Sequence, residues 1–417
     1  MAKNNQLIPT ELCAFFTLLD DRLGESFVFP LLPFLLEQFT DSGATLALLS
    51  TSYALAQFSV SPLIGALSDR YGRKPILKIC VTGSVIALLL FGITLSLNWS
   101  AILPSWSVSL PLILLFIARI IDGLSGGTAT TATAVLADIS TPENRAKTFG
   151  LIGLAFGLGF AIGPPLGGKL AEINPTLTIL PATIFALINL ALVTWILPET
   201  LPKKSRTLLP KKRNLNPFSQ LANLFSNPLV RKPCLGFFLV FMAFNGATTV
   251  LVLYLKKSFE WSSSLSGWVF ALVGLIAMIV QGGLIGPLVQ RFGELKLTIT
   301  GLGFLIIGCL NIAIANKENS IPIVFLGCSF LAIGTGLVTP CLRSLISRRI
   351  KDSNQGTVLG GLQGLQSLGT CIGGVLAGIA FDFDERSPFI GAGLILLIVI
   401  LLLAGIPFYK KKTISNA

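Results

Sequence analysis

Long apolar runs separated by short polar connections occupy almost the whole chain of 417 residues. A helix needs about 20 largely apolar residues to cross a bilayer, and twelve runs of that kind can be marked. The pattern therefore predicts an all-α integral membrane protein with twelve transmembrane helices. The expected spans are Leu12–Gln38, Ala44–Leu67, Ile76–Asn98, Leu110–Ala137, Thr148–Ala171, Leu177–Leu197, Pro233–Leu255, Leu265–Val289, Leu297–Ala315, Ile321–Ile346, Gly356–Phe381 and Phe389–Tyr409.

Composition agrees with a membrane protein and restricts its chemistry. Charged residues make up only 12% of the chain, against about 25% in soluble proteins. The chain has no histidine, which excludes a histidine-ligated metal and a histidine proton relay. Its seven cysteines are scattered without metal-ligand spacing. We expect no metal and no cofactor, and carboxylates must carry any protons that the protein handles.

Basic residues are distributed unevenly between the two sides of the predicted bundle. The termini and even-to-odd connections hold 23 of the 31 lysines and arginines, and the opposite side holds five. The positive-inside rule places both termini in the cytoplasm, and we expect a multi-pass protein of the cell (inner) membrane. The net charge of +12 could also suggest nucleic acid, but no basic-aromatic module is visible, so we expect none to bind.

Two related halves are indicated by the longest connection and by internal similarity. The basic connection over residues 198–232 divides the chain into six-helix bundles over 1–197 and 233–417. "GALSDRYG" at Gly65 corresponds to "GPLVQRFG" at Gly286, and a second pair of stretches corresponds in the same order. Parallel repeats of this kind place a site between the halves near mid-membrane. We expect two pseudo-symmetric bundles around a central cavity.

The stretch "GALSDRYGRKP" resembles the loop 2–3 motif of the major facilitator superfamily. The resemblance is strongest to its drug:proton antiporter branch of tetracycline and multidrug exporters. It implies a charge latch that holds one alternating-access state. The alternative is a topology signal combined with a tight turn, although an acid is not needed for such a signal. The candidate latch residues are Gly65, Asp69, Arg70, Gly72, Arg73, Lys74 and, at the end of the fourth run, Asp138.

A second stretch, "GLGFAIGPPLGG" in the fifth run, resembles the motif associated with antiporters. Its glycines form a smooth surface for close helix approach, and its two prolines should kink the helix. Ordinary helix packing is the alternative interpretation. The motif residues are Gly157, Gly163, Pro164, Gly167 and Gly168.

The first run carries four ionisable residues in the stretch "LLDDRLGESF". Asp20 matches an acidic residue of tetracycline-type exporters, whereas Asp21, Arg22 and Glu25 are additions to that pattern. Each costs roughly 2.5–3.5 kcal/mol at a helix centre, so a polar cavity is expected, with Arg22 pairing with Asp21 or Glu25. A structural ion cluster or a span displaced toward the cytoplasm are the alternatives.

The fourth run adds Arg119, which matches the family's buried arginine, and Asp122, which lies three residues later and can pair with it. Runs seven to twelve contain no clearly mid-membrane acid, and Arg343 lies about one turn from the cytoplasmic end. Proton handling should therefore belong to the first half. Candidates for the substrate path, which could equally be helix–helix hydrogen bonds, are Gln57, Asn245, Gln281, Asn311, Gln363 and Gln366.

Together these features predict a monomeric secondary transporter in the lipid bilayer. It would export a small amphipathic or drug-like molecule in exchange for protons by alternating access. The acids of the first half exceed its buried bases by two, which favours a cationic or neutral substrate. A metabolite exporter or importer (for a sugar, amine or siderophore) and a non-transporting receptor or scaffold remain alternatives. The residues show no nucleophile–base pair or nucleotide loop, so an enzyme is not expected.

Overall fold

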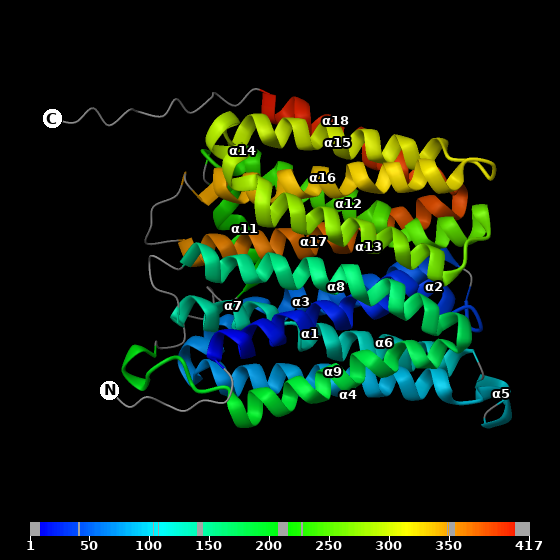
Figure 1. The fold of residues 1–417 in the computed structure, drawn as a ribbon, viewed down its shortest axis with the longest axis horizontal. Helices are drawn as coiled ribbons and strands as arrows, with labels where there is room; N and C mark the ends of the chain where they lie inside the picture. Colours follow the sequence, from blue (N-terminus) through cyan, green and yellow to red (C-terminus); the bar gives the residue numbers. More distant parts are fainter. Residues whose placement is uncertain are drawn as a thin grey trace.

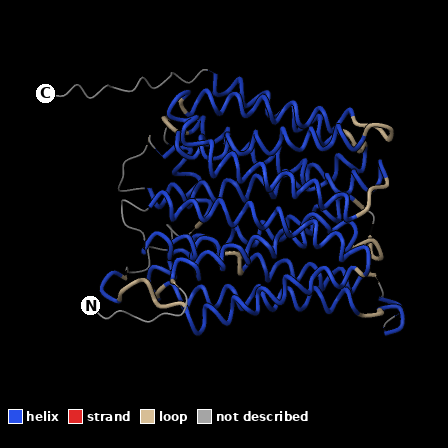
Figure 2. Tube along the Cα trace, viewed as in Figure 1, coloured by secondary structure: helices blue, strands red, loops and turns tan. Residues whose placement is uncertain are grey.

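The computed structural model describes residues 9–40, 42–102, 104–106, 108–139, 145–206, 216–226, 228–347, 349 and 355–404. These residues form helices joined by short loops, without a strand among them (Figure 2). The long helices lie side by side along one direction (Figure 1). The predicted all-α membrane fold is therefore confirmed.

The first half consists of long helices that begin or end near the two faces of the bundle. Its elements are α1 (Thr10–Val28), η1 (Phe29–Leu31), α2 (Leu32–Leu35), α3 (Gly43–Tyr71), α4 (Arg73–Ser96), α5 (Trp99–Ile102), η2 (Pro104–Trp106), α6 (Ser109–Leu124), α7 (Thr128–Ile139), α8 (Arg145–Ile173), η3 (Pro175–Thr178), α9 (Ile179–Ala191) and η4 (Leu192–Ile196).

The connection over residues 198–232 contains η5 (Lys203–Ser205) and α11 (Pro217–Ser226). The second half follows with α12 (Arg231–Phe259), α13 (Ser263–Ile279), η6 (Val280–Leu284), α14 (Ile285–Phe292), α15 (Glu294–Ile314), α16 (Ser320–Ser347), α17 (Gln355–Phe383) and α18 (Ser387–Ala404).

Ten helical segments of the described chain are long and apolar enough to cross a membrane. The helix α3 makes eleven if its two parts, which meet at 45° around Pro62, form one span. The remaining predicted span, α1, is 19 residues long and carries the four ionisable side chains. It packs among α7, α8 and α9 inside the first half. These helices correspond to the twelve predicted runs.

Both ends of the described chain lie at the same face of the bundle. The helix α1 begins and α18 ends at the left in Figure 1. We call this face the terminal end and the opposite one the far end.

The internal similarity has a structural counterpart in the turns between paired helices. Gly72, between α3 and α4, has φ of 109°, and Gly293, between α14 and α15, has φ of 77°. Only glycine adopts such angles without strain. The two copies of the repeated stretch therefore make the same kind of turn.

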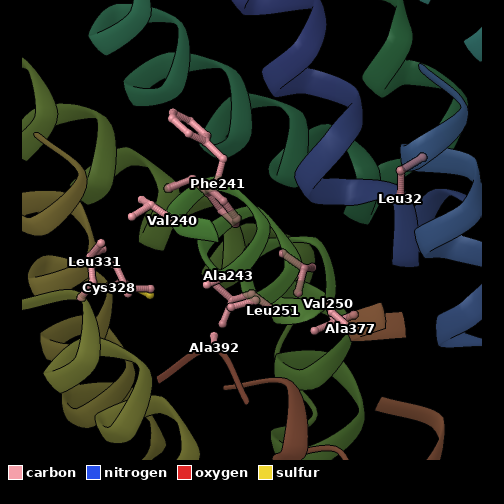
Figure 3. Packing of buried hydrophobic residues seen from close by; sticks show 14 of the residues in the cluster. Leu32, Val240, Phe241, Ala243, Val250, Leu251, Cys328, Leu331, Ala377 and Ala392 are labelled. Atoms are coloured by element: carbon pink, nitrogen blue, oxygen red, sulfur yellow. The ribbon is translucent and has the colours of Figure 1, made fainter. Parts of the chain in front are cut away.

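The halves contact each other mainly where α8 packs on α13 and α3 packs on α17. Within the second half, α12 is the central helix, with its side chains packed between neighbouring helices (Figure 3). The packed residues in this view include Val240, Phe241, Ala243, Val250 and Leu251 of α12, Cys328 and Leu331 of α16, Ala377 of α17 and Ala392 of α18.

Candidate functional site

Asp20 is buried against the last span of the first half. Its carboxylate accepts a hydrogen bond from Asn189 Nδ2 of α9 over 2.7 Å. The amide oxygen of Asn189 in turn accepts from Thr17 Oγ1 over 2.8 Å. Asn189 was not among the predicted site residues. The signal for it is a lone amide within the apolar stretch "FALINLALV".

Arg22 pairs with both of the acids proposed as its partners. Its Nη2 lies 2.7 Å from Asp21 Oδ2, and its Nη1 lies 2.6 Å from Glu25 Oε2. The three side chains are partly exposed, which means that they border a space rather than solid packing. One positive charge thus faces two negative charges within a single helix.

Arg119 and Asp122 form a second, looser pair on α6. Arg119 Nη1 lies 3.5 Å from Asp122 Oδ2. The guanidinium also lies over the ring of Tyr53 on α3, 4.6 Å from its centroid. A cation above an aromatic face is stabilised by the ring quadrupole. The guanidinium of Arg119 is therefore stabilised by both the Asp122 carboxylate and the Tyr53 ring.

A small cavity of about 30 Å³ inside the first half is lined by the four acids and by Tyr53. A space of this size holds roughly one water molecule. Four acids from two helices thus share one pocket, although Asp20 points to α9 and the others do not. The lining residues are Asp20, Asp21, Gly24, Glu25, Tyr53, Val81, Ser84, Leu88, Asp122, Gly126, Thr128 and Ala186.

The amide candidates for the substrate path fall into separate groups. Gln57 lies beside the first-half pocket, since its Nε2 donates to Tyr53 Oη and to the carbonyl of Gly126, two lining residues, each over 3.2 Å. Asn311 donates to the carbonyl of its own helix at Ile307, and α15 packs on α16 and α18 rather than on the first half. Asn311 therefore lies away from the pocket.

The remaining amide candidates lie on α12, α17 and η6 of the second half. Asn245 of α12 donates to Thr370 Oγ1 of α17 over 2.9 Å. Gln366 accepts from Arg343 over 2.6 Å. Gln363 is half-buried on the same helix, and Gln281 is half-buried within the short helix η6.

Three of the candidate latch residues, Asp69, Arg73 and Asp138, form one ion network at the terminal end. Arg73 Nη1 lies 2.6 Å from Asp69 Oδ1, and Arg73 Nε lies 3.0 Å from Asp138 Oδ2 on α7. Gly72 makes the turn between α3 and α4, whereas Arg70 lies over the ring of Tyr71. Described side chains thus join three helices of the same half.

Further contacts to this network come from the start of the connecting region. Glu199 accepts hydrogen bonds from the backbone N–H groups of Arg73 and Lys74 at the first turn of α4. Thr200 donates to Asp138 Oδ2 over 3.1 Å. A carboxylate at a helix N-terminus is stabilised by the helix dipole. The sequence reasoning missed both residues, which follow a proline in "LPET".

The glycines of the α8 motif face two neighbouring helices. A Cβ at Gly157 would lie 2.8 Å from Met278 Cβ, and one at Gly168 would overlap the carbonyl of Ser263, both on α13. A Cβ at Gly163 would overlap Ser26 of α1, and one at Gly167 would lie 2.9 Å from Leu31. Gly65 of the latch motif, by contrast, has open space at this position.

The expected kink at Pro164 and Pro165 does not interrupt α8. The helix runs from Arg145 to Ile173 with both prolines inside it. The carbonyl of Pro164 lies where a Cβ on Gly267 of α13 would collide with it. The motif therefore allows close contact between the two halves.

A link between the halves also lies at the far end. Lys256 Nζ of α12 is 3.0 Å from Glu37 Oε2 and donates to the carbonyl of Pro33 over 3.1 Å. Asp382 at the end of α17 accepts from the backbone N–H of Gly43 at the start of α3 over 2.9 Å. Neither contact was predicted, because such a pairing depends on the packing of remote helices.

Some residues of the sequence interpretation lie outside the described part of the chain. They include several of the basic residues used to orient the chain, among them Lys3, Lys211, Lys351 and Lys410. Among the described residues, no group of three or more metal-ligating side chains is found.

The first-half pocket can hold charge and water inside an apolar bundle. Ionisable residues in membrane helices are costly and commonly mark ion or substrate pathways. Asp20 receives only a neutral amide in the described structure, whereas the other acids face guanidinium groups. Asp20 can therefore bind and release a proton without breaking an ion pair, whereas Asp21, Glu25 and Asp122 would each lose one.

Comparison with known proteins assigns the chain to one family. The Major Facilitator Superfamily model matches residues 13–374 and, in a second match, 233–416. The tetracycline resistance protein, class C, of Escherichia coli is 30% identical over 95% of this chain and 96% of its own length.

Solved structures give the same result. The human organic anion transporter MFSD10 has a TM-score of 0.72 and 26% identity, covering 94% of this chain and 98% of its own. A D-xylose–proton symporter has a TM-score of 0.76 at 18% identity over 95% of this chain and 97% of its own, which supports the fold alone. The chain belongs to the Major Facilitator Superfamily of membrane transporters and is similar to its tetracycline-resistance members.

Proposed function

We propose that the protein is a proton-coupled exporter of a small amphipathic molecule. The observation that carries this proposal is the pocket of four acids in the first half of a chain similar to tetracycline resistance proteins. Asp20 would take a proton from outside and release it inside. The polar surroundings that this proton exchange needs would be provided by Asp21, Arg22, Glu25 and Asp122.

The orientation follows from the basic residues. The terminal end would face the cytoplasm, because most lysines and arginines belong to connections on that side. The latch network around Arg73 would then be cytoplasmic, and the Lys256–Glu37 pair would face outward. The molecule would be a monomer of the cell membrane without nucleic acid as a partner.

Alternating access would use the two halves, 1–197 and 233–417, as moving units joined by 198–232. The contacts between α8 and α13 support this proposal, since glycines there allow sliding surfaces without bulky side chains. The Arg73 network would stabilise one state, and the far-end link at Lys256 would close the outer side in the state described.

The charge of the pocket bears on the substrate. Four acids against Arg22 and Arg119 leave an excess of two negative charges when all are ionised. This excess favours a cationic group on the part of the substrate that enters the first half. The similar proteins are named for resistance to tetracycline and for transport of organic anions, so they support a drug-like amphiphile without fixing its charge.

Growth and accumulation assays test this function. A strain that lacks the chain would be compared with the same strain carrying it, in the presence of tetracycline or ethidium. An exporter raises resistance and lowers accumulation of the compound. Loss of growth on a nutrient in the deleted strain would instead indicate an importer. No difference in any of these assays would contradict transport and favour a receptor or scaffold.

A further inference from the structure

Arg343 is a charged residue of the second half that the proposed proton exchange does not use. It lies on α16, four residues before the end of that helix at Ser347. Its guanidinium points into the bundle, because it contacts Gln366 of α17 and lies 5.8 Å from the ring centroid of Phe237 on α12. Phe237 is fully buried, so this is not a side chain reaching outward to lipid headgroups.

No carboxylate among the described residues forms an ion pair with Arg343. Both other arginines within the spans, Arg22 and Arg119, have acidic partners. The described hydrogen bond of Arg343 goes from Nη2 to Gln366 Oε1 over 2.6 Å, and its Nε is buried without a partner in the described chain. A guanidinium has five N–H donors, so most of its hydrogen-bonding capacity is unused here.

Gln366 belongs to a polar strip on α17. Thr370 Oγ1 donates to the carbonyl of Gln366 over 3.0 Å and accepts from Asn245 Nδ2 over 2.9 Å. On a helical wheel this strip lies about 150° from the exposed apolar face of the same helix. The strip consists of Gln363, Gln366 and Thr370. The exposed apolar face consists of Ile372, Leu376 and Ile379.

The strip therefore lies on the side of α17 that faces the interior of the protein. The helix α17 also packs on α3 of the first half, for example where Thr51 Oγ1 donates to the carbonyl of Cys371. Arg343 and Gln366 are thus placed near the boundary between the halves, toward the terminal end of the bundle.

A purely structural role for Arg343 does not account for its positive charge. A neutral donor would satisfy Gln366 equally well, whereas a charged residue within a membrane helix is costly and usually functional. The planar guanidinium matches a carboxylate through two parallel hydrogen bonds. Gln366 holds one nitrogen and leaves the others without a partner in the described structure.

We propose that Arg343, oriented by Gln366, binds a carboxylate of the transported molecule. The substrate would then be an amphiphile with an acidic group, which contacts the second half while any cationic group faces the acids of the first. This inference rests on the proposed transport function and revises its expectation of a purely cationic or neutral substrate.

Two dyes that differ at one group provide the test. Rhodamine 110 carries a carboxylate, and rhodamine 123 is its methyl ester with the same cationic ring system. Binding of each dye to the purified full chain in nanodiscs would be followed by fluorescence anisotropy. We expect the wild type to bind rhodamine 110 more tightly by about tenfold, an effect of roughly 1.4 kcal/mol. Equal affinities would overturn the inference.

Variants separate recognition from folding. Arg343→Gln should remove the preference for rhodamine 110 without changing the affinity for its ester, rhodamine 123. Arg343→Lys should keep part of the preference for rhodamine 110. Arg349→Gln is the matched control, because Arg349 lies just beyond α16 and contacts only a backbone carbonyl, at Leu229, among the described residues. An unchanged preference in Arg343→Gln, or its loss in Arg349→Gln, would contradict the assignment. If Arg343→Gln does not give a monodisperse protein, Gln366→Leu should weaken the preference while keeping the charge.

The outcome is independent of proton coupling. Binding preference without proton exchange in vesicles would retain the anion site and reject the proposed exporter. Proton exchange without any preference between the two dyes would retain the proposed exporter and reject the anion site.

Discussion

Asn189 of α9 donates a hydrogen bond to the buried carboxylate of Asp20 on α1 over 2.7 Å. Thr17 fixes the amide by donating to its oxygen, so the amide nitrogen points at the carboxylate. The two helices that begin and end the first half are therefore joined at the acid that we propose as the proton carrier. A neutral partner leaves that acid free of the ion pairs that hold Asp21 and Asp122.

Replacement of Asn189 should reveal the strength of this contact. Asn189→Leu removes a hydrogen bond to a charged group and should lower the free energy of unfolding by about 1.5–3 kcal/mol. In an Asp20→Leu background the same change should cost about 0.5 kcal/mol or less, because the partner is absent. Thermal unfolding in detergent measures both.

Asn311→Leu serves as the control, since that amide bonds only to its own helix at Ile307 in the described structure. Equal losses for Asn189→Leu in both backgrounds would show that the amide acts through packing alone.

Removal of the Arg22 charge should affect folding before it affects transport. Arg22→Gln leaves Asp21 and Glu25 without their shared cation and should reduce stability by up to about 3 kcal/mol. The triple change of Asp21→Asn, Arg22→Gln and Glu25→Gln should restore much of the yield, because no charge is then left unpaired. Size-exclusion chromatography of a fluorescent fusion gives the folded fraction. Normal yield of Arg22→Gln with altered substrate choice would instead make Arg22 a substrate contact.

The Arg73 network should matter more for transport than for stability. Its ion pairs are partly exposed, so each is worth about 1 kcal/mol or less for folding. Arg73→Gln should nevertheless slow transport by about tenfold or more, since roughly 1.4 kcal/mol of bias between states has that effect. The neighbouring Lys74→Gln should be milder, because no ion pair of Lys74 is found in the described structure. Equal effects of both variants would reduce the network to a topology signal.

Glycines of α8 should tolerate side chains according to their contacts. Gly157→Val should impair transport severely, because a Cβ there would lie 2.8 Å from Met278 Cβ and 3.2 Å from the carbonyl of Gly274. Gly153→Val on the same helix has no atom within 4 Å of the added Cβ and should be nearly silent. Transport rates normalised to folded protein make the comparison. A similar loss at both positions would show that helix propensity, and not the contact with α13, determines the effect.

Much of the fold follows from the sequence, because membrane spans are specified by local hydropathy. The runs around α4, α12 and α15 match helices to within four residues at each end, and Gly72 and Gly293 mark the same turn in both repeats. The span at α1 was also predicted, although its four ionisable residues make it the least apolar of the set.

Apart from Asp138, which the family resemblance placed near the loop motif and which pairs with Arg73, the contacts of the candidate site were predictable only where partners are close in sequence. The pairing of Arg22 with Asp21 and Glu25, and that of Arg119 with Asp122, depends on spacing along a single helix. The contacts of Asn189 with Asp20 and of Lys256 with Glu37 join remote segments. No local pattern specifies which helices meet, so these contacts required the packed structure.

Proton exchange at Asp20 is tested most directly in everted membrane vesicles with an imposed proton gradient. The discharge of the gradient would be followed with a pH-sensitive dye as tetracycline, ethidium, rhodamine 123 or rhodamine 110 is added. Wild type and Asp20→Asn would be compared with Glu11→Gln, which removes an exposed carboxylate from the first turn of α1. We predict discharge by wild type and Glu11→Gln and none by Asp20→Asn. Discharge by Asp20→Asn equal to that of wild type would contradict the assignment of the proton to Asp20, and no discharge by wild type with any compound would contradict proton-coupled export.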